Sequence, residues 1–268
     1  MDYIQIAIKA AETEQELLIS QLSELNSTGF EQQDDRLLAF FPREGFDGAT
    51  LTALLQGYDY TQETVKEQNW NELWERNFPP VIVEDFCAVR AHFHEPITTV
   101  RHEIIITPKM SFGTGHHATT YMMMKQMEAL PFSGKNVFDF GTGTGILAIL
   151  AEKLGAAAVD AIDVDEWSIA NAQENSERND CRRIALSLST NIPDKDYDII
   201  LANINRNVIL QYLPLLKKRL KPGGLLLLSG LLKEDETDIV KECDSIKLKR
   251  IRILERQNWI SLLFRERD

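Results

Sequence analysis

The residues most suited to chemistry form a glycine-rich turn followed by an acid. The motif D-F-G-T-G-T-G covers residues 139–145, and the apolar run 158–162 ends at Asp163. Glycine has no Cβ, so it permits positive φ and a close approach of ligand to backbone. An acid about 20 residues after the glycines, at the end of the next strand, can bind both hydroxyls of a ribose. This spacing predicts a site for an adenosine-bearing ligand.

The spacing of the glycines separates the candidate ligands. A dinucleotide motif, G-x-G-x-x-G, would place its third glycine at position 146, where this sequence has Ile146. The observed G-x-G-x-G, with Asp139 before it, is the pattern of enzymes that use S-adenosylmethionine, a ligand without a pyrophosphate. We therefore predict a methyltransferase. A nicotinamide-dependent oxidoreductase and a βα turn without any ligand are the alternatives.

Strands and helices alternate through the second half of the chain, which predicts an α/β fold. Two alternating apolar segments, 247–254 and 259–264, close the sequence with Gln257 and Asn258 near the turn between them. An antiparallel hairpin added to a parallel sheet is typical of the Rossmann-like class I methyltransferase fold. The strands are expected at 137–139, 158–162, 184–188, 198–202 and 225–228, and the helices at 146–154, 166–179, 206–220 and 234–243.

The first 66 residues have a separate pattern. Strands are expected at 3–8, 36–41 and 58–65, an amphipathic helix at 13–25 and a short helix at 49–55. We take these elements to indicate the order β-α-β-β-α-β of a small ferredoxin-like α+β domain, in which one of the four strands is not assigned bounds. We expect residues 1–66 to be a substrate-recognition domain, 67–95 a linker and 96–268 the catalytic domain. The pair Trp70 and Trp74 in this linker is expected to pack between domains.

The charge of the chain is negative and unevenly distributed. Of the formal net charge of −12, residues 1–66 carry −8, from twelve acids and four bases. Solvated helix faces are the ordinary explanation, and attraction of a basic partner is the functional one. The overall charge argues against direct nucleic-acid binding. No apolar run is long enough to cross a membrane and no signal peptide is expected, so we predict a cytoplasmic protein.

The cysteines and histidines could in principle hold a metal ion. The three cysteines are far apart in sequence, which suggests neither a disulfide framework nor a zinc site. Five histidines fall within residues 92–117, but neither a nearby cysteine pair nor an H-x-x-x-H helix accompanies them. No metal is expected. The histidines are His92, His94, His102, His116 and His117.

Several motifs resemble one family. The most specific is F-G-T-G-H-H-A-T-T at 112–120, a glycine-rich loop before a helix that could close over a ligand. The others are N-W-N-E-L-W-E-R-N-F at 69–78, V-F-D-F-G-T-G-T-G-I-L-A at 137–148, I-D-V-D at 162–165, A-N-I at 202–204 and K-P-G-G at 221–224. Together they resemble the bacterial methyltransferases of ribosomal protein L-eleven, the PrmA family. Ala118 and the segment 205–207 differ from the commoner residues of that family.

The resemblance implies a two-domain, S-adenosylmethionine-dependent lysine methyltransferase. Members trimethylate lysine side chains and the N-terminal amine of a ribosomal protein, which the small N-terminal domain recognises. The family residues that contact the cofactor match Thr120, Gly141, Asp163 and Asn203. Phe112, Gly113 and Gly143, from the two glycine-rich segments, complete our candidate cofactor-binding set. Another protein, or a small-molecule amine, is the alternative substrate.

Asn203 also bears on the chemistry of the acceptor. Methyltransferases that act on planar amides or amines carry N-P-P-Y at this place, and this chain has N-I-N-R at 203–206. The missing Pro and Tyr disfavour a planar nitrogen substrate. Methyl transfer to a lysine is an in-line displacement for which positioning is the main requirement. Asn203 is a candidate to orient the amine, and no residue is identified as a general base.

Overall fold

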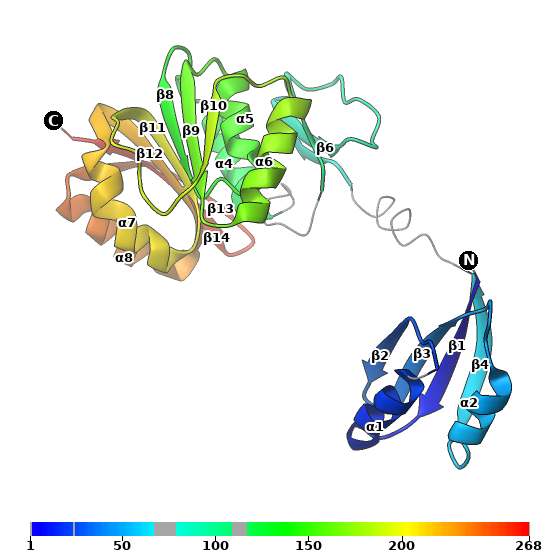
Figure 1. The fold of residues 1–268 in the computed structure, drawn as a ribbon. Helices are drawn as coiled ribbons and strands as arrows, with labels where there is room; N and C mark the ends of the chain where they lie inside the picture. Colours follow the sequence, from blue (N-terminus) through cyan, green and yellow to red (C-terminus); the bar gives the residue numbers. More distant parts are fainter. Residues whose placement is uncertain (1, 24, 67–78, 109–116, 268) are drawn as a thin grey trace. The chain divides into compact units, whose positions relative to one another are not determined.

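The computed structural model describes residues 2–23, 25–66, 79–108 and 117–267 (Figure 1). Phe112, Gly113, Trp70 and Trp74 lie outside these ranges, so the structure leaves their predicted roles unexamined. The chain divides into two compact units, Met1–Asn77 and Phe78–Asp268. No helix among the described residues is long and apolar enough to span a membrane.

The smaller unit has the order predicted from the sequence. Its four-stranded sheet has the strand order β2-β3-β1-β4, and the pairs β2/β3, β3/β1 and β1/β4 are antiparallel, which is the ferredoxin-like arrangement. The elements are β1 (Asp2–Lys9), α1 (Glu12–Ser23), β2 (Gly29–Gln33), β3 (Arg36–Pro42), α2 (Gly48–Leu54) and β4 (Tyr60–Lys66).

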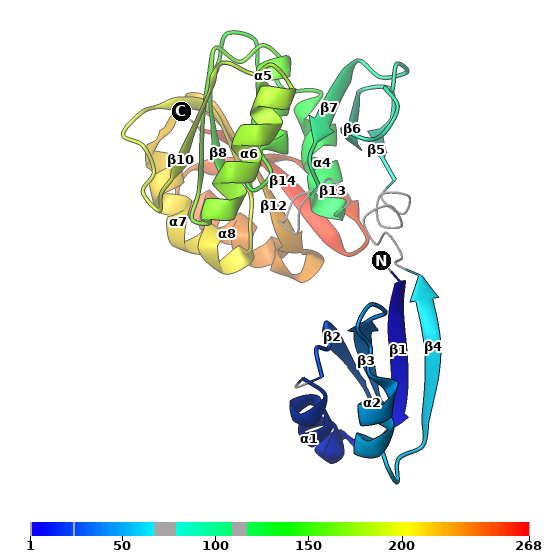
Figure 2. The same cartoon turned by 45° about the vertical axis from the view of Figure 1, so that its right-hand side comes forward.

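The core of this unit follows from the period-two pattern of β1. Ile4, Ile6 and Ile8 are buried on one face because successive side chains of a strand point to opposite sides. They pair in register with Phe41, Ala39 and Leu37 of β3. Both helices lie on this same face (Figure 2), where Leu18, Leu22 and Leu51 pack into the core. The smaller unit therefore has a hydrophobic core of its own.

The larger unit is built on a seven-stranded sheet of order β10-β9-β8-β11-β12-β14-β13. The pairs from β10 to β12 are parallel, and β14 runs antiparallel between β12 and β13, which confirms the predicted terminal hairpin. The strands are β8 (Asn136–Phe140), β9 (Ala158–Asp163), β10 (Ile184–Leu188), β11 (Tyr197–Asn203), β12 (Leu220–Leu232), β13 (Leu248–Arg256) and β14 (Trp259–Glu266).

Helices cover both faces of this sheet (Figure 1). Along β11, Ile199 and Leu201 face one hydrophobic core while Ile200 and Ala202 face the other. The near-continuous apolar run of this strand is explained by burial on both sides. The helices are α4 (Ala118–Met127), α5 (Ile146–Lys153) and α6 (Glu166–Arg178) on one face, and α7 (Arg206–Lys218) and α8 (Glu236–Ser245) on the other, with the short 3₁₀ helix η1 (Lys233–Asp235) before α8.

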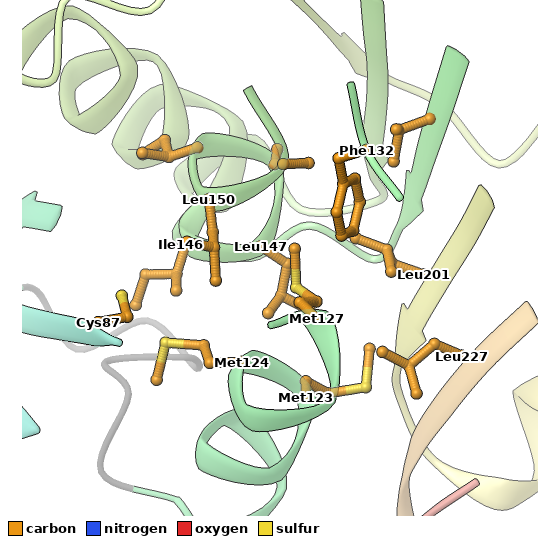
Figure 3. Close-up of a cluster of buried hydrophobic side chains, with 14 of the residues drawn as sticks. Cys87, Met123, Met124, Met127, Phe132, Ile146, Leu147, Leu150, Leu201 and Leu227 are labelled. Carbon is orange, nitrogen blue, oxygen red and sulfur yellow. The ribbon is translucent and has the colours of Figure 1, made fainter. Parts of the chain in front are cut away.

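Methionines fill the core between α4 and the sheet. Met123, Met124 and Met127 are fully buried. Figure 3 shows Met127 beside Leu147 of α5, Met123 beside Leu227 of β12, and Met124 directed toward Cys87. Unbranched methionine side chains fill irregular gaps of this kind well. This packing fixes α4, whose first turn reaches the functional site.

A second, three-stranded sheet lies in the larger unit. It consists of β5 (Val81–Val83), β6 (Cys87–Ala91) and β7 (His102–Ile106), with β6 and β7 parallel. All five residues of β6 are buried, and Cys87 and Val89 belong to the same core as α5. Residues 81–95, which we expected in the linker, thus lie within the larger unit.

Candidate functional site

The main pocket lies at the carboxyl ends of the parallel strands. It has a volume of about 470 Å³ and opens between β8 and β11, where the strand order reverses. Ligands of open α/β sheets bind at such switch points. The pocket is lined by His117, Thr119, Phe140, Gly141, Gly143, Ile162, Asp163, Val164, Ser168, Ser189, Asn203, Ile204, Asn205, Val208, Gly230 and Trp259.

The glycine-rich turn needs glycine for two different reasons. Gly141 has φ of 75°, and a Cβ at this position would lie 2.4 Å from Cγ2 of Ile204. Gly145 has φ of 81°, and a Cβ there would lie 3.1 Å from Cβ of Ala172 on α6. The first glycine therefore leaves room at the pocket, whereas the third allows α6 to pack against the start of α5.

Asp163 holds the turn in place through hydrogen bonds. Its Oδ2 accepts from the backbone N–H of Gly143 at 2.8 Å, and its Oδ1 accepts from Val164 at 2.8 Å and Asp165 at 3.1 Å. A carboxylate offers about four acceptor positions, so these bonds leave capacity on Oδ2. Asp163 is half-buried in the pocket wall, where such an oxygen suits a ligand hydroxyl.

Asp139 lies beneath the same turn and is fully buried. Its Oδ2 accepts a 2.7 Å hydrogen bond from Oγ1 of Thr142, and its Oδ1 has no hydrogen-bond partner among the described residues. Burial raises the pKa of this carboxyl from an ordinary 3.8 to about 7, and the nearby Asp163 charge adds to the rise. Asp139 is therefore a buried acid whose charge is suppressed near neutral pH.

Asn203 ends β11 and is joined to the start of α4. Its Nδ2 donates to Oγ1 of the buried Thr120 at 3.3 Å. Its Oδ1 is buried and finds no hydrogen-bond partner in the described part of the chain. Asn203 lines the pocket, and its amide is held to Thr120.

Two aromatic residues of the pocket were missed from the sequence. His117 caps the N-terminus of α4, with Nδ1 within 2.8 Å of Oγ1 of Thr119, and its ring meets the ring of Trp259 edge-on at 4.6 Å between centroids. Trp259 begins β14 directly after Gln257 and Asn258, which both have positive φ. Only the pairing of the terminal hairpin brings Trp259 to the pocket, so no local motif could have revealed it.

The structure brings most of the predicted cofactor residues together. Gly141, Gly143, Asp163 and Asn203 line the pocket, and Thr120 reaches it through its hydrogen bond to Asn203. The described residues contain no group of three or more potential metal ligands. His116 lies outside those residues.

The fold and this pocket define a class I methyltransferase, which uses S-adenosylmethionine. A sequence profile of the family "Ribosomal protein L11 methyltransferase (PrmA)" matches residues 6–267. The chain therefore belongs to the ribosomal protein L11 methyltransferase (PrmA) family, as the motifs predicted. The same membership removes the oxidoreductase alternative.

Individual relatives agree with this assignment. A ribosomal protein L11 methyltransferase of Porphyromonas gingivalis is 42% identical over 94% of this chain and 91% of its own length. One of Chlorobaculum tepidum is 34% identical over 98% of this chain and 96% of its own length. The crystal structure of a ribosomal protein L11 methylase from Lactobacillus delbrueckii subsp. bulgaricus matches with a TM-score of 0.65 at 28% identity, covering 70% of this chain and 99% of the other.

Proposed function

We propose that this protein methylates amino groups of ribosomal protein L11, on lysine side chains and at the N-terminal amine, up to the trimethylated state. The relatives carry the name of that substrate. The observation that carries the nitrogen chemistry is Asn203 in the pocket wall, whose Oδ1 has no hydrogen-bond partner among the described residues. An amine N–H is a fitting donor for this oxygen.

The chain's residues fit S-adenosylmethionine in the pocket. Asp163 would bind the ribose hydroxyls, and Gly141 and Gly143 provide a wall without side chains next to it. Thr120 would contact the cofactor and keep Asn203 oriented. Phe112 and Gly113 complete the proposed set on the strength of the family resemblance. When bound, the cofactor supplies an electrophilic methyl group on a sulfonium.

The transfer itself requires an uncharged amine held in line with the methyl group. The nitrogen lone pair forms the new N–C bond while the C–S bond breaks and its electrons remain on sulfur. A lysine has a reference pKa near 10.4, and desolvation together with a nearby positive charge lowers it. The proton leaves to solvent before transfer. Positioning by Asn203 is thus the main contribution of the chain, and we assign no general base.

The smaller unit is the proposed substrate-recognition domain. Residues 1–66 carry −8 of the net charge, and the unit has its own core. A negative surface attracts a basic protein and repels nucleic acid. We therefore expect protein contacts rather than direct RNA contacts, and a cytoplasmic location where ribosomal proteins are made.

The deciding experiment is methyl transfer from labelled S-adenosylmethionine to L11, free and in undermethylated ribosomes, with mass spectrometry of the product. We expect mono-, di- and trimethylated lysines. Asn203→Ala, assayed at saturating cofactor, should lower the transfer rate by about two orders of magnitude, as losses of a transition-state hydrogen bond do. Transfer to free lysine but not to L11 would favour the small-molecule alternative.

A further inference from the structure

Three asparagines lie in a row along one face of α6 and its C-cap. Asn171, Asn175 and Asn179 are four residues apart, and all three are buried. Asn179 accepts from the N–H of Ile105 at 3.0 Å and donates to its carbonyl at 2.7 Å. Asn171 donates to the carbonyl of Thr107 at 3.1 Å. The side chains thus satisfy backbone groups at the edge of β7, as a neighbouring strand would.

Asn175 differs from Asn179 because it also reaches the glycine-rich turn. Its Oδ1 accepts from the N–H of Thr107 at 2.8 Å, and its Nδ2 donates to the carbonyl of Thr144 at 2.9 Å. Thr144 is the residue before Gly145, whose close approach to Ala172 places α6 against the same turn. A single buried amide therefore joins the turn to the chain at Thr107.

Thr107 is fixed by α6 from several sides. Its Oγ1 donates to Glu174 at 2.7 Å, in addition to the backbone bonds with Asn171 and Asn175. Where the described chain resumes, His117 and Thr119 line the pocket. Asn175 accordingly contacts both the glycine-rich turn, which lines the pocket, and the chain at Thr107.

We propose that Asn175 is a positioning residue that sets the glycine-rich turn relative to Thr107 and thereby tunes the affinity for S-adenosylmethionine. The proposal rests on the proposed function only in taking this turn to be the cofactor site. The amide of Asn175 is rigid and binds two backbone segments, so it specifies the distance between Thr107 and Thr144. Asn179 does not contact the glycine-rich turn, so it cannot specify that distance. If these asparagines only stabilised the fold, changes at Asn175 and Asn179 would affect cofactor affinity equally.

The first test uses Asn175→Asp with Asn179→Asp as the matched control. The ionised carboxylate keeps the acceptor for Thr107 and loses the donor to Thr144. At pH 8 we expect cofactor affinity, measured by calorimetric titration, to fall about tenfold for Asn175→Asp, the change produced by ~1.4 kcal/mol. Asn179→Asp, which leaves the turn untouched, should change it less than twofold. Equal effects on affinity would overturn the proposal.

The pH dependence of the variant supplies a readout that lost stability would not give. Below its pKa, which burial raises, the new carboxyl carries a proton and donates to Thr144 as the amide did. The ratio of wild-type to Asn175→Asp affinity should therefore fall toward one at pH 5.5. Asp139, Asp163 and Glu174, the acids around the turn and Thr107, are present in both proteins, so the wild type measured at the same pH values is the control. A ratio that stays constant across this range would contradict positioning by the donor.

A second measurement uses the wild-type protein and needs no folded variant. Cofactor binding should slow amide hydrogen exchange at Thr107, whose N–H bonds to Asn175, more than at Ile105, whose N–H bonds to Asn179. Equal protection at both amides would refute the coupling. If the wild-type protein fails to bind S-adenosylmethionine at all, the proposed function fails first, so the two failures are distinguishable.

Discussion

At the scale of single residues, Asp163 has two tasks on one carboxylate. It anchors the turn through three backbone N–H groups, and it remains available to a ligand at the pocket wall. Its removal is therefore expected to disturb both the turn and the cofactor. The two effects can be separated by comparing a variant that keeps one acceptor oxygen with one that keeps none.

We expect Asp163→Ala to weaken S-adenosylmethionine binding by tenfold or more, because charge-assisted hydrogen bonds contribute about 1.5–3 kcal/mol. Asp163→Asn, which retains one oxygen, should show an intermediate loss. Calorimetric titration measures both affinities, and urea unfolding reports the accompanying loss of stability. An unchanged affinity in Asp163→Ala would remove Asp163 from the cofactor site.

Asp139 gives the protein a pH-dependent stability. The pKa of this carboxyl is raised to about 7 in the folded state. Between pH 4 and 7 the folded protein therefore keeps a proton that the carboxyl of the unfolded chain has already lost. The contribution is complete below about pH 4 and is lost as pH rises through 7. Asp139→Asn should abolish this dependence. In urea unfolding without cofactor, the free energy of unfolding of Asp139→Asn minus that of the wild type should grow from pH 5 to 7 and then level off. A difference that does not depend on pH would contradict the assignment.

At the scale of elements, the loop after β11 packs between two glycines, because Ile204 contacts both Gly141 and Gly230. Cγ2 of Ile204 lies 2.4 Å from where a Cβ of Gly141 would be, and its backbone oxygen lies 2.1 Å from where a Cβ of Gly230 would be. Both glycines have positive φ. The position of Asn203 is therefore set by the two glycines around its neighbour Ile204 and by its own hydrogen bond to Thr120 of α4.

Gly141→Ala should destabilise the site by a clash with a side chain, and Ile204→Ala should relieve part of that clash. The double variant should recover part of the cofactor affinity lost in Gly141→Ala, leaving about 1 kcal/mol of backbone strain. Gly230→Ala meets a backbone oxygen instead, so Ile204→Ala should not rescue it. A double-mutant cycle on cofactor affinity checks this; rescue of both glycine variants, or of neither, would be inconsistent with the geometry.

Local patterns in the sequence predicted much of this architecture. The glycine spacing and the acid at Asp163 located the pocket, and the alternating segments after residue 247 predicted the terminal hairpin. Contacts that depend on distant pairing were missed. Asn171, Asn175 and Asn179 have the appearance of an ordinary polar helix face, because the backbone edge that they satisfy is contributed by β7, more than 60 residues earlier. Trp259 was missed for the same reason.

At the scale of the whole molecule, the charge of residues 1–66 gives the proposed recognition of L11 a salt dependence. Deleting residues 1–66 should leave the affinity for S-adenosylmethionine nearly unchanged and abolish methylation of L11. In the full-length protein, methylation should decline with salt more steeply than cofactor binding, because exposed charges are screened. Methylation of L11 by the truncated protein at the full-length rate would contradict substrate recognition by this segment.

The separate hydrophobic cores of the two units also have a thermodynamic consequence. A chain with one core in Met1–Asn77 and others in Phe78–Asp268 should melt in two heat-absorption peaks rather than one. S-Adenosylmethionine stabilises only the part that binds it, by mass action. In scanning calorimetry the larger peak should move to higher temperature as cofactor is added, while the smaller stays where it is. A joint shift would mean that the two parts of the molecule unfold as one.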